Sequence, residues 1–231
     1  MVAHAFQTEM DELMNAVAKM GGAAEEQLGQ ALEAVQRRDG TQAQAVVAAD
    51  ATLDQMESDI DKQVATMFVR RQPMATDLRV TLSSIKIASA IERVGDLAKN
   101  TARRSLILND QPALKIVQPI LRFGKETLDQ FSDCLEAYAN RDTEAAMAVW
   151  KRDEQLDVLY NNLMSEIIAE MEASPTQISL LTQTMFISKN MERIGDHATF
   201  IAEMTYYIVT GAPPAEDRPK GPPDGSFGAA K

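Results

Sequence analysis

The segments IERVGDLAKN (residues 91–100) and MERIGDHATF (residues 191–200) share one pattern at a spacing of one hundred residues. Five of the first eight positions are identical, and two more exchange one apolar residue for another. Each segment places a glycine within a helical pattern, between a glutamate and an aspartate. A glycine inside a helix costs about 1 kcal/mol relative to alanine. Its repetition therefore predicts a repeated architecture in which the glycine has a structural purpose.

Helical periodicity extends through almost the whole chain of 231 residues, and prolines gather at its breaks. Aromatic residues make up only 5%, and the apolar residues are mostly Ala, Leu, Val, Ile and Met, which favours helix. RRDG (37–40) and NRDT (140–143) are expected to end the first and fourth helices, and Ser174 to open the sixth through a capping box with Gln177. We predict six long helices, at about 4–38, 41–71, 75–109, 112–140, 142–172 and 175–210.

A second repeated motif supports the same architecture. DATLD (50–54) and DEQLD (153–157) share the pattern D-x-x-L-D, each in the helix that precedes an E-R-x-G-D helix. The sequence thus predicts an all-α fold of two tandem three-helix bundles, residues 1–110 and 111–210. The tail, residues 211–231, holds five prolines and four glycines, and it is expected to be disordered because it has little apolar surface to bury.

The two central glycines lie on lines of small residues. Gly95 and Gly195 continue these lines at alternating steps of four and three along their helices. Small side chains let a neighbouring helix backbone come close, so we expect both glycines to be contact points between helices. Gly21 and Gly22 are expected to bend the first helix.

Four pairs of acidic residues have the spacing i, i+4, which places both members on one helix face. If the second and third helices of each half are antiparallel neighbours, four carboxylates converge in each half. Such a group loses hydration and repels itself, so it requires protons, basic partners or cations. The eight predicted metal ligands are Asp50, Asp54, Glu92, Asp96, Asp153, Asp157, Glu192 and Asp196.

The chemistry of these acids indicates the kind of metal. A site of carboxylates, poor in His and Cys, suits oxygen-seeking cations such as iron(III), manganese, magnesium or calcium. Zinc fits less well because its usual nitrogen and sulfur ligands are missing. The alternative is that the acids form solvated faces paired with basic residues such as Arg93, Arg193, Lys86 or Lys189.

Composition excludes several classes of protein. The net charge of −11 argues against binding to nucleic acid or to an anionic membrane surface. Cys134 is the one cysteine, so no intrachain disulfide forms, and a buried position is expected for it. Neither a signal peptide nor an apolar run long enough for a membrane span is visible. We expect a cytoplasmic protein.

Three motifs resemble the PhoU family of phosphate-signalling regulators: RRQPMATDLR (70–79), IERVGD (91–96) and MERIGDHA (191–198). The resemblance covers roughly residues 5–210. It implies a tandem three-helix repeat, metal clusters of iron or zinc as in some members, and the eight acids above as ligands. It also implies a cytoplasmic regulator, often a homodimer, which acts between the ATPase subunit of a phosphate transporter and a phosphate-sensing histidine kinase. The implied output is repression of the phosphate-starvation response when phosphate is plentiful.

Other functions stay open from the residues alone. A carboxylate-bridged di-metal oxidase normally uses Glu-x-x-His on two helices, but this chain has only His4 and His197, and neither has that spacing. With so few histidines and no Gly-rich phosphate loop, no catalytic arrangement is indicated, and we expect a protein that is not an enzyme. A metal-storage bundle and a helical protein that only dimerises are the remaining alternatives.

Overall fold

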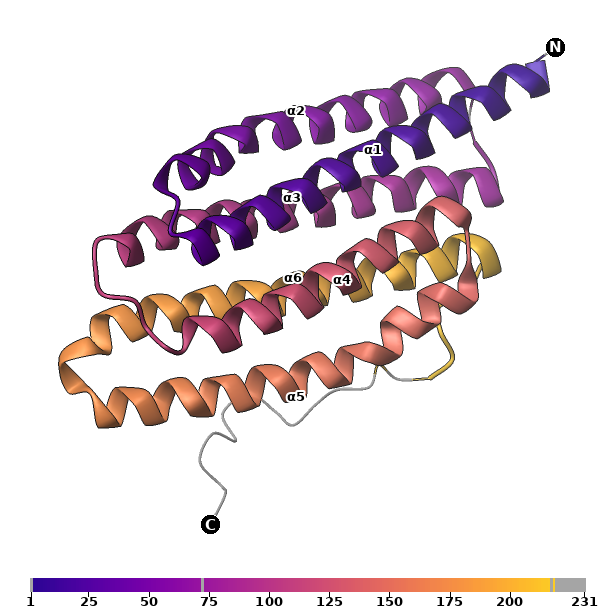
Figure 1. Cartoon of the computed structure of the whole chain (residues 1–231). Helices are drawn as coiled ribbons and strands as arrows, with labels where there is room; N and C mark the ends of the chain where they lie inside the picture. Colours follow the sequence, from indigo (N-terminus) through magenta and orange to yellow (C-terminus); the bar gives the residue numbers. More distant parts are fainter. Residues whose placement is uncertain (1, 72, 217, 219–231) are drawn as a thin grey trace.

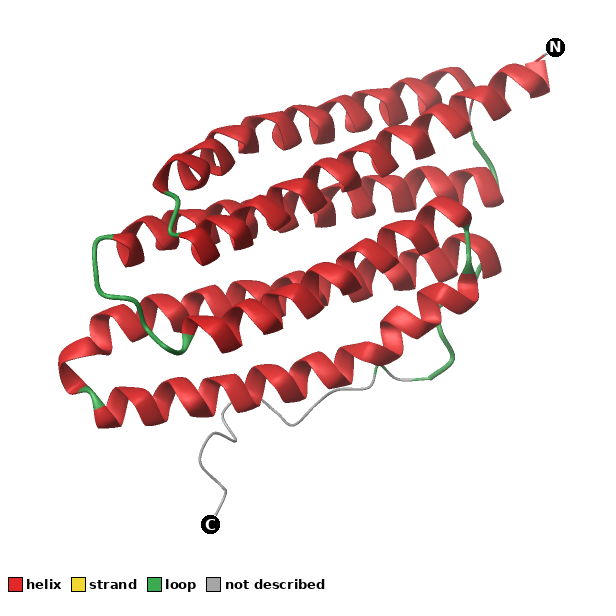
Figure 2. Cartoon of the chain, viewed as in Figure 1, coloured by secondary structure: helices red, strands yellow, loops and turns green. Residues whose placement is uncertain are grey.

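A computed structural model describes residues 2–71, 73–216 and 218 of the chain. The described part consists of helices and connecting loops, without a strand (Figure 2). The predicted all-α fold is therefore confirmed. The helices are α1 (Val2–Arg37), α2 (Gly40–Arg71), α3 (Thr76–Asn109), α4 (Val117–Asn140), α5 (Thr143–Ala173), the short 3₁₀ helix η1 (Pro175–Gln177) and α6 (Ile178–Thr210).

The six long helices form two three-helix bundles that lie side by side (Figure 1). Helices α1, α2 and α3 pack on one another in the first bundle, and α4, α5 and α6 in the second. The bundles meet through α1 against α4 and α3 against α6, whereas α2 and α5 lie on the outside. The buried apolar residues of both bundles belong to one continuous core, in which the predicted burial of Cys134 is confirmed.

The same two-residue turn opens the second helix of each bundle. Arg38 and Arg141 adopt left-handed backbone angles, with φ of 56° and 53°. The aspartate that follows caps the next helix: Asp39 accepts from the backbone N–H groups of residues 41 and 42, and Asp142 from those of residues 144 and 145. These bonds satisfy donors that a helix start leaves unpaired. The predicted ends of the first and fourth helices are confirmed.

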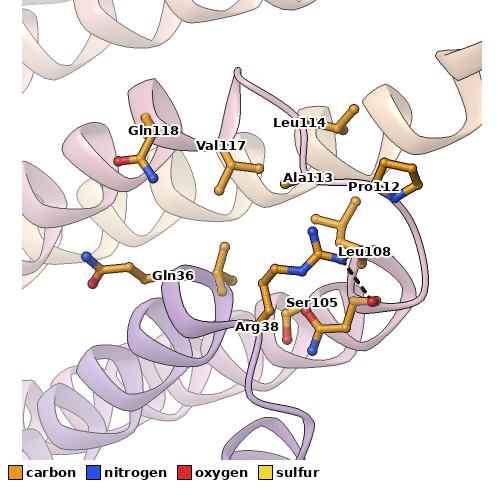
Figure 3. Close-up of a pocket in the computed structure, with 11 residues that line it drawn as sticks. Gln36, Arg38, Ser105, Leu108, Pro112, Ala113, Leu114, Val117 and Gln118 are labelled. Atoms are coloured by element: carbon orange, nitrogen blue, oxygen red, sulfur yellow. Dashed lines mark hydrogen bonds between the residues drawn. The ribbon is translucent and has the colours of Figure 1, made fainter.

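The connection between the bundles is longer than the sequence indicates. Helix α4 begins at Val117, not at residue 112, because the chain must cross from the end of α3 to the second bundle. Arg38 holds this connection by donating to the backbone carbonyls of Leu108 and Asn109, 3.0 and 2.9 Å away. Figure 3 shows Arg38 beside Leu108 and Pro112 in a pocket at this junction.

The capping box expected at Ser174 is wrong. Residues 175–177 form η1, and the Ser174 side chain makes no capping hydrogen bond. The backbone N–H of Gln177 instead donates to the backbone carbonyl of Ser174 at 2.9 Å. This is the donor that the serine hydroxyl would have satisfied, so the tighter turn replaces the side-chain cap.

Glycines and leucines interlock where α1 meets α4. A methyl group on Gly21 would lie 2.5 Å from a methyl carbon of Leu135, and one on Gly124 equally close to Leu32. Gly21 and Gly124 occupy matching positions of the two repeats, and so do Leu32 and Leu135. Helix α1 continues through Gly21, and its close packing against α4 gives this glycine a structural reason, while the bend expected there stays a prediction.

Candidate functional site

A leucine and a glycine align the two acidic motifs in each bundle. Leu53, within D-x-x-L-D on α2, lies against Gly95 of α3, where an added methyl group would be 2.3 Å from Leu53 Cδ1. Leu156 of α5 takes the same place against Gly195 of α6, at 3.1 Å. The close contact predicted at both glycines is confirmed, although the partner is a leucine side chain rather than a helix backbone. This contact sets the carboxylates that flank each leucine beside those that flank each glycine.

The first carboxylate cluster comprises Asp50, Asp54, Glu92 and Asp96. Lys99 of α3 joins its two helices, because its Nζ donates to Asp50 Oδ2 of α2 and to Asp96 Oδ1 of α3, both at 2.5 Å. The side chains of Lys99 and Asp50 are only 16% and 14% exposed, so this bridge is largely shielded from water. Arg93 lies outside it, more exposed, with its guanidinium 3.3 Å from Asp96 Oδ2.

Burial and neighbouring charges shift the pKa values of Glu92 and Lys99. Burial raises the pKa of Glu92, and the charges of Asp96, Glu57 and Asp54 raise it further, against an opposing effect of Arg93. These carboxylates are therefore near enough to repel one another. Burial alone would lower the pKa of Lys99, but its hydrogen bonds to Asp50 and Asp96 outweigh burial and raise it.

The second carboxylate cluster comprises Asp153, Asp157, Glu192 and Asp196. Asp153 on α5 is the most deeply buried, with its side chain 4% exposed. The hydroxyl of Thr199 donates to Asp153 Oδ1 at 2.9 Å. Glu192 on α6 accepts from Lys189 Nζ at 2.9 Å. Asp157 is half-buried on α5.

Arg218, beyond the end of α6, supplies the cation of the second cluster. Its Nε donates to Asp153 Oδ2 at 2.8 Å, and a terminal nitrogen reaches Asp196 Oδ1 at 2.6 Å. Asp153 and Asp196 match Asp50 and Asp96 of the first cluster. Arg218 thus bridges the same two positions that Lys99 bridges in the first bundle.

Neither bridging cation is among the partners predicted for the acids. Lys99 was visible, because it stands three residues after Asp96 on the same helix and could reach it. Position 199 holds Thr, so the repeat itself predicts that the second cluster needs its cation from elsewhere. Arg218 carried no signal of its own, because it lies 65 residues from Asp153 in a proline-rich segment.

Both clusters offer the donors that a hard metal ion prefers. Within the described residues, no three His, Cys, Asp or Glu side chains converge closely enough to hold a metal ion. Lys99 and Arg218 instead provide positive charge between the acids of the neighbouring helices. An all-oxygen donor set that already attracts a bridging cation fits a hard divalent or trivalent ion chemically. The eight predicted ligands stay a prediction.

His197 lies in a groove between α3 and α6 that Lys86, Arg93, Asp196 and Phe200 also line. Burial lowers its pKa, and the nearby Arg193 and Arg93 lower it further, against the effect of Asp196. A neutral imidazole is the form that these surroundings favour.

Of the described helices, none combines the length and apolar character needed to cross a membrane.

Fold and site together define a class of protein: an all-α tandem repeat in which each three-helix unit carries a carboxylate cluster between its second and third helices. A family model described as the PhoU domain matches residues 17–105 and 120–205. The chain belongs to the PhoU family.

Curated relatives match along nearly the full length. The phosphate-specific transport system accessory protein PhoU homolog of Caulobacter vibrioides (strain NA1000 / CB15N) is 42% identical over 213 residues, which cover 92% of this chain and 93% of the relative. The protein of the same name from Rhizobium meliloti (strain 1021) is 39% identical over 220 residues, with 95% and 93% covered.

Solved structures have the same fold. The crystal structure of PhoU from Pseudomonas aeruginosa superposes with a TM-score of 0.87 at 32% identity, covering 90% of this chain and 100% of that one. The phosphate transport system regulatory protein PhoU from Streptococcus pneumoniae gives a TM-score of 0.81 at 29% identity, covering 90% and 98%.

Proposed function

We propose that this chain is a non-enzymatic accessory regulator of a phosphate transport system. The observation that carries the proposal is the match over 92% of the chain to a relative named as a phosphate-specific transport system accessory protein. The regulator is cytoplasmic and forms a homodimer. It contacts the ATPase subunit of the transporter and a phosphate-sensing histidine kinase, and it represses the phosphate-starvation response when phosphate is plentiful.

The long outer faces of α2 and α5 suit an adaptor, because they lie away from the contact between the bundles (Figure 1). A partner shifts the equilibrium of a kinase only if it binds one state of the kinase more tightly. The proposed adaptor prefers the inactive or phosphatase-competent state while the transporter is supplied with phosphate.

Deletion of the gene in its own host tests the regulatory role. A phosphate-regulated reporter should then be active in high-phosphate medium, and the full chain supplied on a plasmid should restore repression. Purified chain should also capture the transporter ATPase and the kinase separately, which shows whether both contacts exist. Normal repression in the deletion strain, with no second copy of the gene, would refute the role.

The carboxylate clusters are proposed as metal sites for iron, manganese, magnesium or zinc. Protein purified without chelator in the presence of manganese or iron should contain more than one ion per chain. Changing Glu92, Asp96, Glu192 and Asp196 to alanine should remove the metal. Four solvent-facing acids away from the clusters serve as the charge-matched control: Asp11, Glu33, Asp59 and Asp129.

Metal content separates this proposal from its alternatives. Equal metal content in the cluster variant and the control would refute the ligand assignment. Oxygen consumption by the iron-loaded protein would favour a carboxylate-bridged oxidase, and many ions per chain would favour a storage bundle.

A further inference from the structure

The chain turns back onto the second bundle after α6. Gly211 has a φ of 85°, the left-handed region that favours glycine, and its backbone N–H donates to the carbonyl of Tyr207 at 2.9 Å. The hydroxyl of Thr210 donates to the carbonyl of Ala212 at 2.8 Å. We call residues 211–216 together with Arg218 the strap.

Two further contacts place the strap on the body of the protein. The guanidinium of Arg79, on α3, lies so close to Gly211 of the strap that a methyl group there would be 2.8 Å from it, and Arg79 Nε also donates to the carbonyl of Ile208, in the last turn of α6, at 3.2 Å. Pro213, Pro214 and Arg218 of the strap line a cavity together with Trp150 of α5.

The strap ends in the bridge between Arg218, Asp153 and Asp196. A carboxylate as buried as Asp153 is costly to keep ionised unless a positive charge compensates it. In the first cluster Lys99 provides that charge from within α3, so the cation is a fixed part of the helix. In the second cluster the helix residue is Thr199, and the cation arrives on a segment that follows the family-model match, which ends at residue 205.

We propose that the strap closes the second carboxylate cluster and that Arg218 is a tethered counter-cation, which a divalent metal ion must displace to bind there. The inference rests on the proposed metal role of the clusters. The guanidinium and the metal ion compete because both need the same carboxylate oxygens of Asp153 and Asp196. Metal binding at this cluster therefore frees the strap and uncovers the cavity beside Trp150, whereas the bridging cation of the first cluster is part of α3 itself.

Manganese titration tests the competition. The first cluster is disabled by Glu92→Gln and Asp96→Asn in the full chain, so that calorimetry reports on the second cluster. Adding Arg218→Gln should tighten manganese binding by about tenfold or more, which corresponds to the loss of one close charge pair. Arg218→Lys keeps the positive charge but loses the contact through two nitrogens. Its manganese affinity should therefore lie between that of Arg218→Gln and that of the background chain with Arg218. Lys125→Gln in the same background removes an exposed lysine of α4 and is the control, and it should leave the affinity unchanged.

The fluorescence of Trp150 reports on the strap without any metal, because Trp150 is the one tryptophan in the sequence. Without metal, Arg218→Gln should shift its emission maximum to longer wavelength, and Lys99→Gln should not. If Arg218→Gln does not fold, the pair Asp153→Asn and Arg218→Gln removes both charges together and gives the same emission test.

The possible results distinguish the strap proposal from the proposal that the clusters bind metal. Manganese binding that is equal with and without Arg218→Gln would overturn the strap while leaving the metal sites in place. An unchanged emission maximum in Arg218→Gln would also overturn it. Absence of manganese from every variant, including those with the first cluster intact, would refute the metal sites themselves, and the competition with them.

Discussion

Leu53 of α2 rests on Gly95 of α3, so close that a single added methyl group would lie 2.3 Å from Leu53 Cδ1. The matching pair in the second bundle, Leu156 and Gly195, is looser at 3.1 Å. Leu53 and Leu156 each stand between the two aspartates of a D-x-x-L-D motif. The pair therefore explains why a helix-weakening glycine recurs between two carboxylates: it admits the leucine that sets the acids of one helix against those of the next.

Gly95→Ala should lower the free energy of unfolding by about 0–2 kcal/mol, because overpacking costs about 1–3 kcal/mol and the better helix propensity of alanine returns about 1 kcal/mol. Gly195→Ala should be neutral or slightly stabilising, since Leu156 has to move by only a few tenths of an ångström. Urea unfolding of both variants measures the difference. Equal stability of the two would show that Leu53 gives way freely.

Glu92→Gln should stabilise the metal-free protein at neutral pH. The pKa of Glu92 is raised in the fold, so the folded state holds this proton more tightly than the unfolded chain does. The ionised form is then destabilising above the folded pKa, and the penalty vanishes as the pH falls below the unfolded value of about 4. The advantage of the glutamine should thus be present at pH 7 and absent near pH 4, measured by urea unfolding with chelator.

Asp59→Asn is the control for the Glu92→Gln experiment, because the pKa of Asp59 is shifted in the opposite direction. Hydrogen bonding from Lys62 lowers the pKa of Asp59, with further contributions from Gln55 and the charge of Lys62. Its ionised form favours the folded state, so the substitution should not stabilise the protein at neutral pH. A gain at pH 7 from Asp59→Asn as large as that from Glu92→Gln would mean that net charge, rather than the cluster, explains the effect.

Lys99→Met should destabilise the protein by about 2–4 kcal/mol, somewhat below the cost of breaking a fully buried ion pair. The methionine keeps the packing of the aliphatic chain while leaving Asp50 and Asp96 without their shared cation. In a cycle with Asp96→Asn, the coupling energy should be about 1–3 kcal/mol. Lys62→Met, whose partner Asp59 is also exposed, should have little effect on stability. A Lys99 effect no larger than this would reduce the bridge to an ordinary surface pair.

Cys134 should resist thiol reagents until the protein unfolds. Its side chain is fully buried on α4, and burial raises its pKa well above the ordinary value, so almost no thiolate is present at neutral pH. The labelling rate across a urea series should follow the global unfolding curve. Fast labelling in the absence of urea would show that α4 opens locally.

The helices and the ends of the first and fourth could be predicted because the signals are local. Helical periodicity and the Arg-Asp dipeptides at 38–39 and 141–142 lie within the segments that they organise. The start of α4 was misplaced because it depends on the distance between the two bundles, which no local pattern encodes. At Ser174 the sequence allowed two ways of satisfying one backbone donor, and a propensity rule could not choose between them.

The faces on which the acids lie could be predicted, but the two bridging cations could not. Arg93 and Lys189, named as possible partners, do pair with Asp96 and Glu192. Spacing of i, i+4 puts Glu92 and Asp96 on one helix face whatever the tertiary fold. The cations that hold the clusters depend on tertiary placement: Lys99 reaches Asp50 across 49 residues of sequence, and Arg218 reaches Asp153 across 65. The repeat itself indicates that the two clusters differ, since the lysine of position 99 has no equivalent at position 199.

The contact between α1 and α4 has a consequence for how the two repeats relate. Leu135 packs on Gly21 and Leu32 packs on Gly124, so each repeat contributes one leucine and one glycine, at matching positions, to the contact. A reciprocal contact of this kind is what two identical subunits form about a two-fold axis. The chain thus has the geometry of a dimer whose subunits have been joined end to end. The two halves of one chain can differ in sequence, so one carboxylate cluster has a lysine where the other has a threonine and a distant arginine.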